Sequence, residues 1–320
     1  MLRTILGRLF IAIPVLLGAT ALTFLAIHSA PGDPILAMVD PDQAGALGPQ
    51  WVEEQRQALG LDKPLPVQYV LWLREIFRGN LGYSMVDRQP VARKVAERLW
   101  PTLKLMLTAF IIGISVSVPI GILAAVKQYS AIDYVSNISG MAMISIPGFF
   151  AGLLGIYVFA LKLKILPTAG MTTVGTQPTV GDTLHHLILP ALVLGLAEAA
   201  PLIRYARSSM LEVICQTYIA VARAKGLRES VVITRHALRN ALIPLITVAA
   251  LLFPSFVGGS VIVEQVFAWP GMGTLAITAV IRRDYPVIMA INLLAAVTVV
   301  LSSLIADVLY VVADPRIRYS

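Results

Sequence analysis

The segment that decides the fold is Leu211–Pro244, which reads LEVICQTYIAVARAKGLRESVVITRHALRNALIP. It is the one long basic segment of an apolar C-terminal half, with seven Lys/Arg and two Glu between Arg204 and Arg239. Apolar residues at helical spacing predict a helix from Leu211 to Ala222. Gly226 is expected to end it, because glycine enters the left-handed C′ conformation without steric cost. A second helix, Glu229 to Leu238, would complete a stiff knob between two apolar runs.

The composition is that of an integral membrane protein. Of the 320 residues, 57% are hydrophobic and 13% are charged, with a mean hydropathy of +0.79, whereas soluble domains carry about 25% charged residues. The net charge of +7 does not indicate nucleic-acid binding, because the cations lie at the ends of apolar runs, as the positive-inside rule requires. The single cysteine, Cys215, excludes an intramolecular disulfide.

Six apolar runs predict six membrane-spanning helices. The first is interpreted as an uncleaved span rather than a signal peptide, since it is longer than a signal core and no clean Ala-x-Ala follows. The third is expected to kink near Pro147. The predicted spans are Leu9–Ile27, Thr102–Val126, Val135–Leu161, Ile188–Ile203, Leu242–Val263 and Val287–Val312.

The stretch Ala30–Leu99 differs in kind, with eight Lys/Arg and nine Asp/Glu among its residues. Frequent turn signals separate short amphipathic helices, expected at Pro66–Arg78 and Pro90–Trp100. It is predicted to be a folded extracytoplasmic insertion. The resulting organisation is a first membrane helix (1–29), the insertion (30–100), and a permease-like core (101–320) that contains the basic loop 204–241.

Small residues recur at four-residue spacing along the second span: Ala109, Gly113, Ser117, Gly121 and Ala125. Such a stripe lets helix backbones approach closely in lipid. Two interpretations stay open, namely packing inside this chain and a seam with a second transmembrane subunit.

Two ionisable residues fall inside predicted spans, Glu198 and Asp307. Intramembrane charges are candidates for function, but pairing with Arg204, Arg316 or Arg318 is the favoured interpretation here.

The fifth span holds residues that interrupt helices, and broken helices at membrane depth tend to line cavities. Candidates for the translocation path or its gate are therefore Pro254, Gly258, Gly259, Ser260 and Glu264, together with Glu198 and Asp307. The pair His185-His186 is placed on an outer loop, and as a metal site it lacks a third ligand.

Counting cations predicts the orientation. The predicted inner segments carry twelve Lys/Arg and the two short outer loops carry four. Both termini are therefore expected to be cytoplasmic. The chain contains no Gly-x-x-x-x-Gly-Lys-Ser/Thr, so it has no P-loop with which to bind ATP.

With these residues in view, the chain resembles the permease subunits of ATP-binding-cassette importers. Their coupling segment reads Glu-Ala-Ala, three residues, Gly, and later Ile-x-Leu-Pro. Here Ala220–Gly226 occupies this place with Ala220 at the glutamate position, and Pro244 comes about five residues later than in the sugar-importer form. These departures fit the dipeptide/oligopeptide/nickel branch, whose Ala-Arg-Ala-Lys-Gly-Leu and His-Ala-Leu-Arg-Asn-Ala-Leu-x-Pro match Ala222–Leu227 and His236–Pro244.

The resemblance extends over at least 300 residues, and the insertion after the first span is similar to that of the B-type permease of the pair. Other matching blocks are Ala30–Pro34, Leu59–Tyr69, Gly79–Ser84, Ile146–Phe149, Gly258–Glu264 and Asp314–Arg318.

The resemblance implies an all-α permease in the bacterial inner membrane that is not an enzyme. It would work with a second permease, two cytoplasmic ATPases, an external binding protein and membrane lipid, and with no nucleic acid. The chain would bind no cofactor and no metal, since ATP and Mg belong to the ATPases. The residues expected to contact an ATPase are Tyr218, Ala222, Arg223, Lys225, Gly226, Leu227 and Arg228. Ala222 and Gly226 are expected to be small so that the two surfaces can close, and the cations to pair with acidic residues.

The implied cargo is di- or oligopeptide, with nickel, glutathione-like and oligosaccharide cargo as alternatives. An ion-driven secondary transporter is a rival interpretation, but it should show mid-membrane charges and an inverted repeat. A structural membrane protein is a second rival, and it would not need the Gly-rich, interrupted spans.

Overall fold

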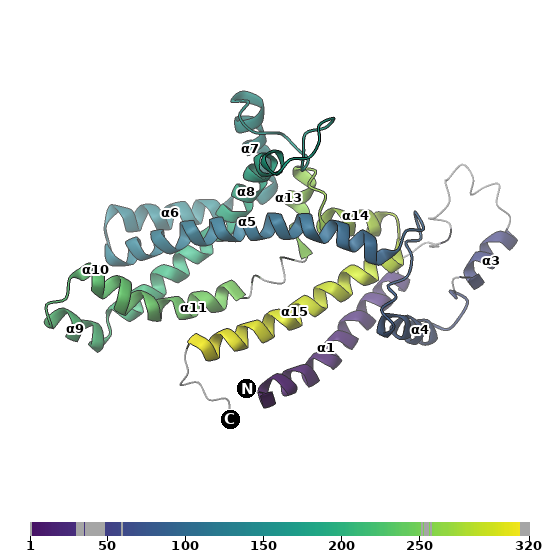
Figure 1. Ribbon diagram of the computed structural model, residues 1–320, viewed down its shortest axis with the longest axis horizontal. Helices are drawn as coiled ribbons and strands as arrows, with labels where there is room; N and C mark the ends of the chain where they lie inside the picture. Colours follow the sequence, from purple (N-terminus) through teal and green to yellow (C-terminus); the bar gives the residue numbers. More distant parts are fainter. Residues whose placement is uncertain are drawn as a thin grey trace. The chain divides into compact units, whose positions relative to one another are not determined.

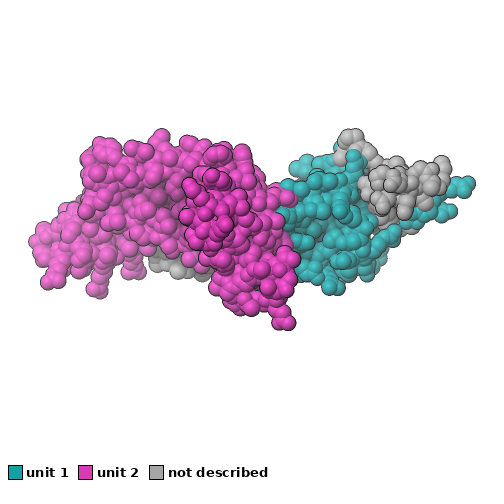
Figure 2. Space-filling model, turned by 90° about the horizontal axis from the view of Figure 1, so that it is seen from above, with its two compact units in different colours: residues 1–101, 271–300 teal, residues 102–270, 301–320 magenta. Residues whose placement is uncertain are grey.

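The computed structural model describes residues 2–29, 35, 49–58, 60–250, 252, 256 and 258–313. Throughout these residues the chain is helical, apart from turns and one isolated bridge between Tyr83 and Pro90. The expected all-α class is confirmed (Figure 1). Two compact units are present, Met1–Pro101 with Gly271–Val300, and Thr102–Pro270 with Leu301–Ser320 (Figure 2).

The first unit holds α1 (Leu2–Ser29), α3 (Pro49–Ala58), α4 (Leu65–Phe77), α14 (Met272–Ile281) and the beginnings of α5 (Val91–Val126) and α15 (Tyr285–Ala313). The α4 helix confirms the amphipathic helix expected at Pro66–Arg78. The helix expected at Pro90–Trp100 is not separate, because it continues through Pro101 into the second predicted span as α5.

The core of the first unit joins segments far apart in sequence. Val91 and Val95 of α5 pack with Met272 and Leu275 of α14 and with Val287 of α15. All five side chains are buried, and burying a side chain of this size stabilises by about 1.5–3 kcal/mol. The start of α5 is therefore part of a folded core and not a solvated linker.

The second unit contains the rest of α5 and α15 and the helices between them. These are α6 (Ala131–Ser145), α7 (Gly148–Gly155), η2 (Ile156–Lys162), α8 (Val180–Ile214), α9 (Thr217–Ala224), α10 (Glu229–Val231), η3 (Val232–Ala237), α11 (Leu238–Ala250) and α13 (Val261–Val266).

The stripe of small residues on α5 packs against α8 of the same chain. A Cβ built on Gly121 would lie 2.5 Å from the Cβ of Ala206 and 2.9 Å from the carbonyl oxygen of Ile203. On the α8 side, a Cβ on Gly195 would lie 2.6 Å from the carbonyl oxygen of Ala109. Contacts below 3.0 Å cannot be accommodated without movement of the backbone. Packing inside the chain is thus the interpretation that the structure supports.

Among the described residues, four helices are long and apolar enough to cross a membrane, and a bent pair makes a fifth candidate. The four are Phe10–Ser29, Val91–Val126, Val180–Ile214 and Tyr285–Ile305. The bent pair, Ala131–Ser145 with Gly148–Lys162, turns by 98°, so the third predicted span is broken at Pro147 and not merely kinked. Pro147 precedes α7 as its N-cap residue, and proline cannot donate the backbone hydrogen bond that would continue α6.

The fifth predicted span is not seen as one helix among the described residues, since α11 ends at Ala250 and α13 begins at Val261. The fourth predicted span, Ile188–Ile203, is shorter than the helix that contains it, α8. Thr179 caps α8 by accepting a hydrogen bond from the Asp182 amide, so the helix begins well before Ile188. His185 and His186 consequently lie in the first turns of a helix and not on a loop.

Candidate functional site

Between the end of α8 and the start of α11, the basic segment forms short helices on either side of a turn (Figure 1). The helix before the turn is α9, and α10 follows the turn. The expected continuous helix from Leu211 to Ala222 is wrong, because α8 ends at Ile214 and α9 starts at Thr217, after Cys215 and Gln216. Beyond the turn, α10, η3 and α11 follow one another without a gap from Glu229 to Ala250. The predicted helix–turn–helix is present, with an additional break before it.

The α9 helix has an inner and an outer face. Ile219 is fully buried and Ala222 is 7% exposed, and both belong to a cluster with Ala125 of α5 and Met210 of α8. The methyl group of Ala222 therefore packs against this chain, and the expectation that its small size lets a partner surface close stays a prediction. The outer face carries exposed apolar side chains, among them Val221.

Gly226 has the backbone conformation that the sequence predicted. Lys225 is the C-cap of α9, so Gly226 is C′, and its φ is +76°. A Cβ added to Gly226 would meet nothing within 4 Å. Within this chain, glycine is therefore required for the left-handed turn and not for lack of space.

At the turn, Arg223 is engaged inside the chain. Arg223 donates from its NH2 group to Oε1 of Glu229 at 2.6 Å and from Nε to Oε2 at 3.1 Å. The hydrogen bond from Arg223 lowers the pKa of Glu229, and the pair raises the pKa of Arg223. This fork closes the turn, and the expected pairing of Arg223 with acidic residues of an ATPase stays a prediction. Lys225 and Arg228 are exposed and have no ion-pair partner among the described residues.

Tyr218 and Leu227 lie on the outer side of the turn, 43% and 41% exposed. The phenol of Tyr218 accepts a hydrogen bond of 2.7 Å from Nδ2 of Asn240, which ties α9 to α11. The exposed surface of the segment thus carries both apolar side chains and cations, and the buried face of α9 and the Tyr218–Asn240 bond hold its backbone in place.

The structure adds an ion pair that sequence reasoning missed. Asp133 of α6 is buried and accepts two hydrogen bonds from Arg207 of α8, at 2.6 and 2.8 Å. It also accepts from the amide of Tyr129 and from Nδ2 of Asn137. The only signal in the sequence was an acid beside the short loop after Lys127, which did not reveal a partner 74 residues away.

The residues Gly259 and Ser260, which interrupt the fifth predicted span, lie beside Glu264. Gly259 has φ +67°, and a Cβ there would collide with the carboxylate of Glu264. Ser260 caps α13, since its hydroxyl accepts from the Val263 amide at 3.5 Å. Glu264 is fully buried and accepts a hydrogen bond of 2.8 Å from Thr102 of α5. The predicted interruption is present, and its carboxylate fixes the break to α5.

Among the described residues, Glu198 is not paired with Arg204. Its Oε2 atom is buried and has no hydrogen-bond partner among the described residues. Arg204 lies six positions later and is exposed, and residues at that spacing do not share a helix face. Pro254 and the side chain of Asp307 lie outside the described residues, as do Arg316 and Arg318.

His186 is buried, and its Nε2 lies 3.6 Å from Oδ1 of Asp182. Within the described part of the chain, no group of three or more His, Cys, Asp and Glu side chains is arranged to hold a metal ion.

Comparison with known protein families shows which family the chain belongs to. Residues 117–319 match the family described as the binding-protein-dependent transport system inner membrane component, and residues 1–106 match the model of the N-terminal part of that component. The chain belongs to this family. It is therefore a multi-pass permease subunit, a transport component and not an enzyme. Permeases of this family bind no cofactor, because ATP is bound by partner ATPases.

Relatives align along almost the whole chain. The oligopeptide transport system permease protein AppB of Bacillus subtilis is 46% identical over 316 residues, covering 98% of this chain and 99% of the relative. A putative peptide permease of Brucella suis is 44% identical, covering 99% of each. The glutathione transport system permease protein GsiC of Escherichia coli is 41% identical, covering 100% of each.

Among solved structures, the chain is similar to the MetNI methionine ABC transporter in an inward-facing conformation. The TM-score is 0.55 at 19% identity, over 69% of this chain and 96% of the other. A second crystal form gives 0.53 at 20% identity, over 68% and 95%. This likeness shows the fold alone.

Proposed function

We propose that this permease is one of two related membrane subunits of an importer for short peptides, powered by two cytoplasmic ATPases and supplied by an external binding protein. Relatives named for oligopeptide, peptide and glutathione transport support this cargo class, since glutathione is itself a small peptide. The family supports the dependence on a binding protein and on ATPases.

The proposed topology has six spans with both termini in the cytoplasm. Residues 1–29 form the first span, 30–100 an extracytoplasmic insertion beneath the binding protein, and 101–320 the permease core. In this arrangement α11, α13 and the chain between them cross the membrane as one broken segment, and loop 204–241 faces the ATPases.

The observation that carries the coupling proposal is the two-faced α9 helix. Its inner face, Ile219 and Ala222, is fixed in the chain's own core, so a force applied to its outer face is passed to α5 and α8. The surface that contacts the ATPase is formed by Tyr218, Val221, Leu227, Lys225 and Arg228, with Arg223 and Gly226 shaping the turn. Apolar anchors with a cationic rim suit a groove that is apolar at its centre and acidic at its edge.

Closure of the ATPases would then move α5 and α8 together, since these helices approach too closely to slide apart freely. Alternating access follows if that motion shifts the balance between inward- and outward-facing states. The break at Gly258–Ser260, supported by Glu264, is the proposed gate element. Glu198 is kept as a candidate for the path, as are Pro254 and Asp307.

The test is Gly226→Val in the complete transporter reconstituted in liposomes. A β-branched residue at φ +76° introduces about 1–3 kcal/mol of backbone strain and should reshape the turn. ATP-driven uptake of labelled tri-alanine should fall to background while the amount of membrane-inserted chain stays the same.

Gly181→Val is the matched control. Gly181 also has open space around its Cβ, but its φ is not positive, so uptake should be retained. Wild-type uptake by Gly226→Val would contradict the coupling proposal. Failure of the wild-type transporter to accumulate either tri-alanine or glutathione would contradict the cargo.

A further inference from the structure

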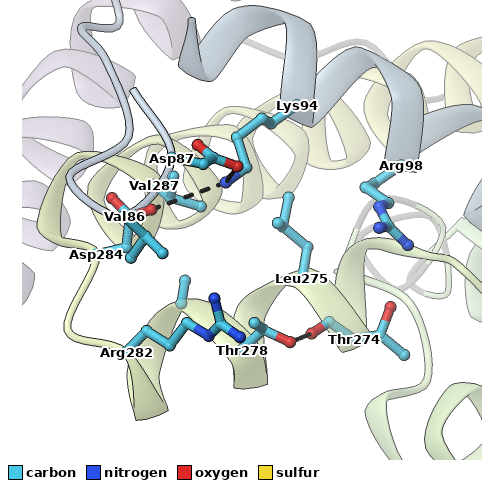
Figure 3. A pocket seen from close by; sticks show the side chains of 11 residues that line it. Val86, Asp87, Lys94, Arg98, Thr274, Leu275, Thr278, Arg282, Asp284 and Val287 are labelled. Atoms are coloured by element: carbon cyan, nitrogen blue, oxygen red, sulfur yellow. Dashed lines mark hydrogen bonds and ion pairs between the residues drawn. The ribbon is translucent and has the colours of Figure 1, made fainter. Parts of the chain in front are cut away.

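The first unit contains a cavity of about 280 Å³ that lies outside the site described above. Figure 3 shows it between the start of α5, the end of α14 and the segment before α5, with Leu275 projecting into its middle. Its wall mixes apolar side chains with three cations, Lys94, Arg98 and Arg282. The volume suits the end group of a small molecule better than a whole cofactor.

One side of the cavity is a closed network of charges. Asp284 is buried, accepts a hydrogen bond of 3.0 Å from the Met85 amide and is bonded by the Ser84 hydroxyl. Lys94 lies 2.8 Å from Asp87 and 3.9 Å from Asp284. Burial opposes ionisation of Asp87, but the hydrogen bonds from Lys94 and Ser84 prevail and lower its pKa. The two carboxylates and Lys94 therefore satisfy one another and form a fixed wall.

Unlike Lys94, the two arginines of the cavity, Arg98 and Arg282, do not belong to this network of charges. Arg98 projects from α5 and Arg282 from the end of α14, toward the same hollow (Figure 3). Neither guanidinium group has a hydrogen-bond or ion-pair partner among the described residues. The neighbouring acid on α5, Glu97, is already bonded to Arg93 at 2.8 Å. The carboxylates of Asp87 and Asp284 also line the cavity, but they are engaged by Lys94, the Ser84 hydroxyl and the Met85 amide, so the two guanidinium groups line the same hollow without a carboxylate partner in the described chain.

We propose that this cavity binds the terminal carboxylate of a short peptide, with Arg98 and Arg282 as its ligands. Guanidinium groups fit a planar carboxylate through two parallel hydrogen bonds. The apolar side chain of Val86, which is partly exposed and lines the cavity, suits the side chain of the last residue. The hydroxyl of Thr278, which donates to the Thr274 carbonyl, keeps lone pairs for a peptide N–H.

This inference rests on the proposed peptide cargo and makes it more specific, because recognition of a free carboxylate discriminates peptide acids from peptide amides. In the proposed topology the cavity is extracytoplasmic. It would hold the carboxyl end of a peptide while the peptide passes from the binding protein to the permease.

The experiment measures the reactivity of the arginines, not transport. The assembled transporter in nanodiscs of phosphatidylcholine is treated with phenylglyoxal, which modifies accessible arginines, and each site is quantified by mass spectrometry. Tri-alanine should slow modification of Arg98 and Arg282 by about fivefold or more, and tri-alanine amide should not. Arg74, an exposed arginine of α4 outside the cavity, is the internal control and should react alike in all samples.

Two variants test the pairing. In Arg98→Gln and in Arg282→Gln, the concentration of tri-alanine that protects the remaining arginine should rise about tenfold, as expected when one charge-assisted contact is lost. Arg74→Gln should leave it unchanged. Equal protection by acid and amide, or unchanged protection in both cavity variants, would overturn the proposal.

The source of the carboxylate is tested in the same assay. Protection by the peptide-free binding protein but not by tri-alanine would assign the cavity to an acidic side chain of that protein and overturn the proposal. Protection by anionic phosphatidylglycerol alone would assign it to a lipid headgroup, with the same consequence.

Uptake of labelled tri-alanine is measured separately. Uptake without protection would refute the cavity and leave the proposed function standing, and protection without uptake would refute the proposed function alone.

Discussion

Two arginine–carboxylate pairs of the second unit have the same chemistry and different surroundings. Arg207 bonds Asp133 through Nε and NH2, and Arg223 bonds Glu229 through the same two nitrogens. The side chain of Asp133 is 5% exposed, whereas that of Glu229 is 52% exposed. One pair joins two long helices and the other closes a surface turn.

The two pairs differ in how well water can solvate a charge whose partner has been removed. Removing one partner from a buried pair leaves a desolvated charge, which is strongly destabilising, and Asp133 is further committed to Tyr129 and Asn137. Exposed Glu229 would be hydrated as soon as its partner moved away. The buried pair therefore fixes α6 to α8, while the exposed pair can open when a partner protein approaches.

The largest effect is expected from Asp133→Asn, which breaks the buried pair. Arg207 would keep its charge without a counter-charge, and we expect the free energy of unfolding to fall by about 3 kcal/mol. Thermal unfolding in detergent, followed by tryptophan fluorescence, measures this loss. In a double-mutant cycle, Asp133→Asn with Arg207→Gln should cost less than the sum of the single changes. Strict additivity would mean that the pair does not act as a unit.

A smaller effect is expected from Arg207→Lys, which keeps the charge and removes the fork. A lysine ammonium is a point donor and cannot make two parallel bonds to one carboxylate. We expect a loss of roughly 1–2 kcal/mol in the same unfolding assay. A loss as large as that of Asp133→Asn would show that geometry, and not charge, dominates at this site.

The smallest effect on overall stability is expected from Glu229→Gln, which weakens the exposed pair. Because the hydrogen bond from Arg223 lowers the pKa of Glu229 below its usual 4.5, the pair stabilises the turn above that pH. It should lose this contribution as the pH falls below 4.5 toward the folded-state pKa.

Amide hydrogen exchange over residues 224–231 is the suitable measurement. Protection of wild type should decline on acidification more than that of Glu229→Gln, while the unfolding temperature of the two proteins stays alike. A large drop in unfolding temperature for Glu229→Gln would remove the distinction between the two pairs.

The backbone conformation of the basic segment was predictable at Gly226, where a single residue determines it. Gly226 takes positive φ because that position follows a helix C-cap, and no other residue enters this conformation as readily. The break between α8 and α9 at Cys215 and Gln216 was missed, because apolar periodicity continues through it and neither residue is a turn former. His185 was placed in a loop for a different reason, because the predicted span began only at Ile188, although the Thr179 cap lay a few residues upstream.

By itself, the sequence determined which stretches are apolar enough to enter a membrane, where glycine and proline interrupt them, and which family the chain joins. These properties depend on composition and on neighbours within a few residues. Only the tertiary structure decided that the small stripe of α5 faces α8, that Ala222 faces inward, that Asp133 meets Arg207, and that Arg98 and Arg282 line one cavity. Periodicity shows that a helix face needs a partner, but the partner is set by helices distant in sequence, whose close packing leaves one arrangement free of collisions.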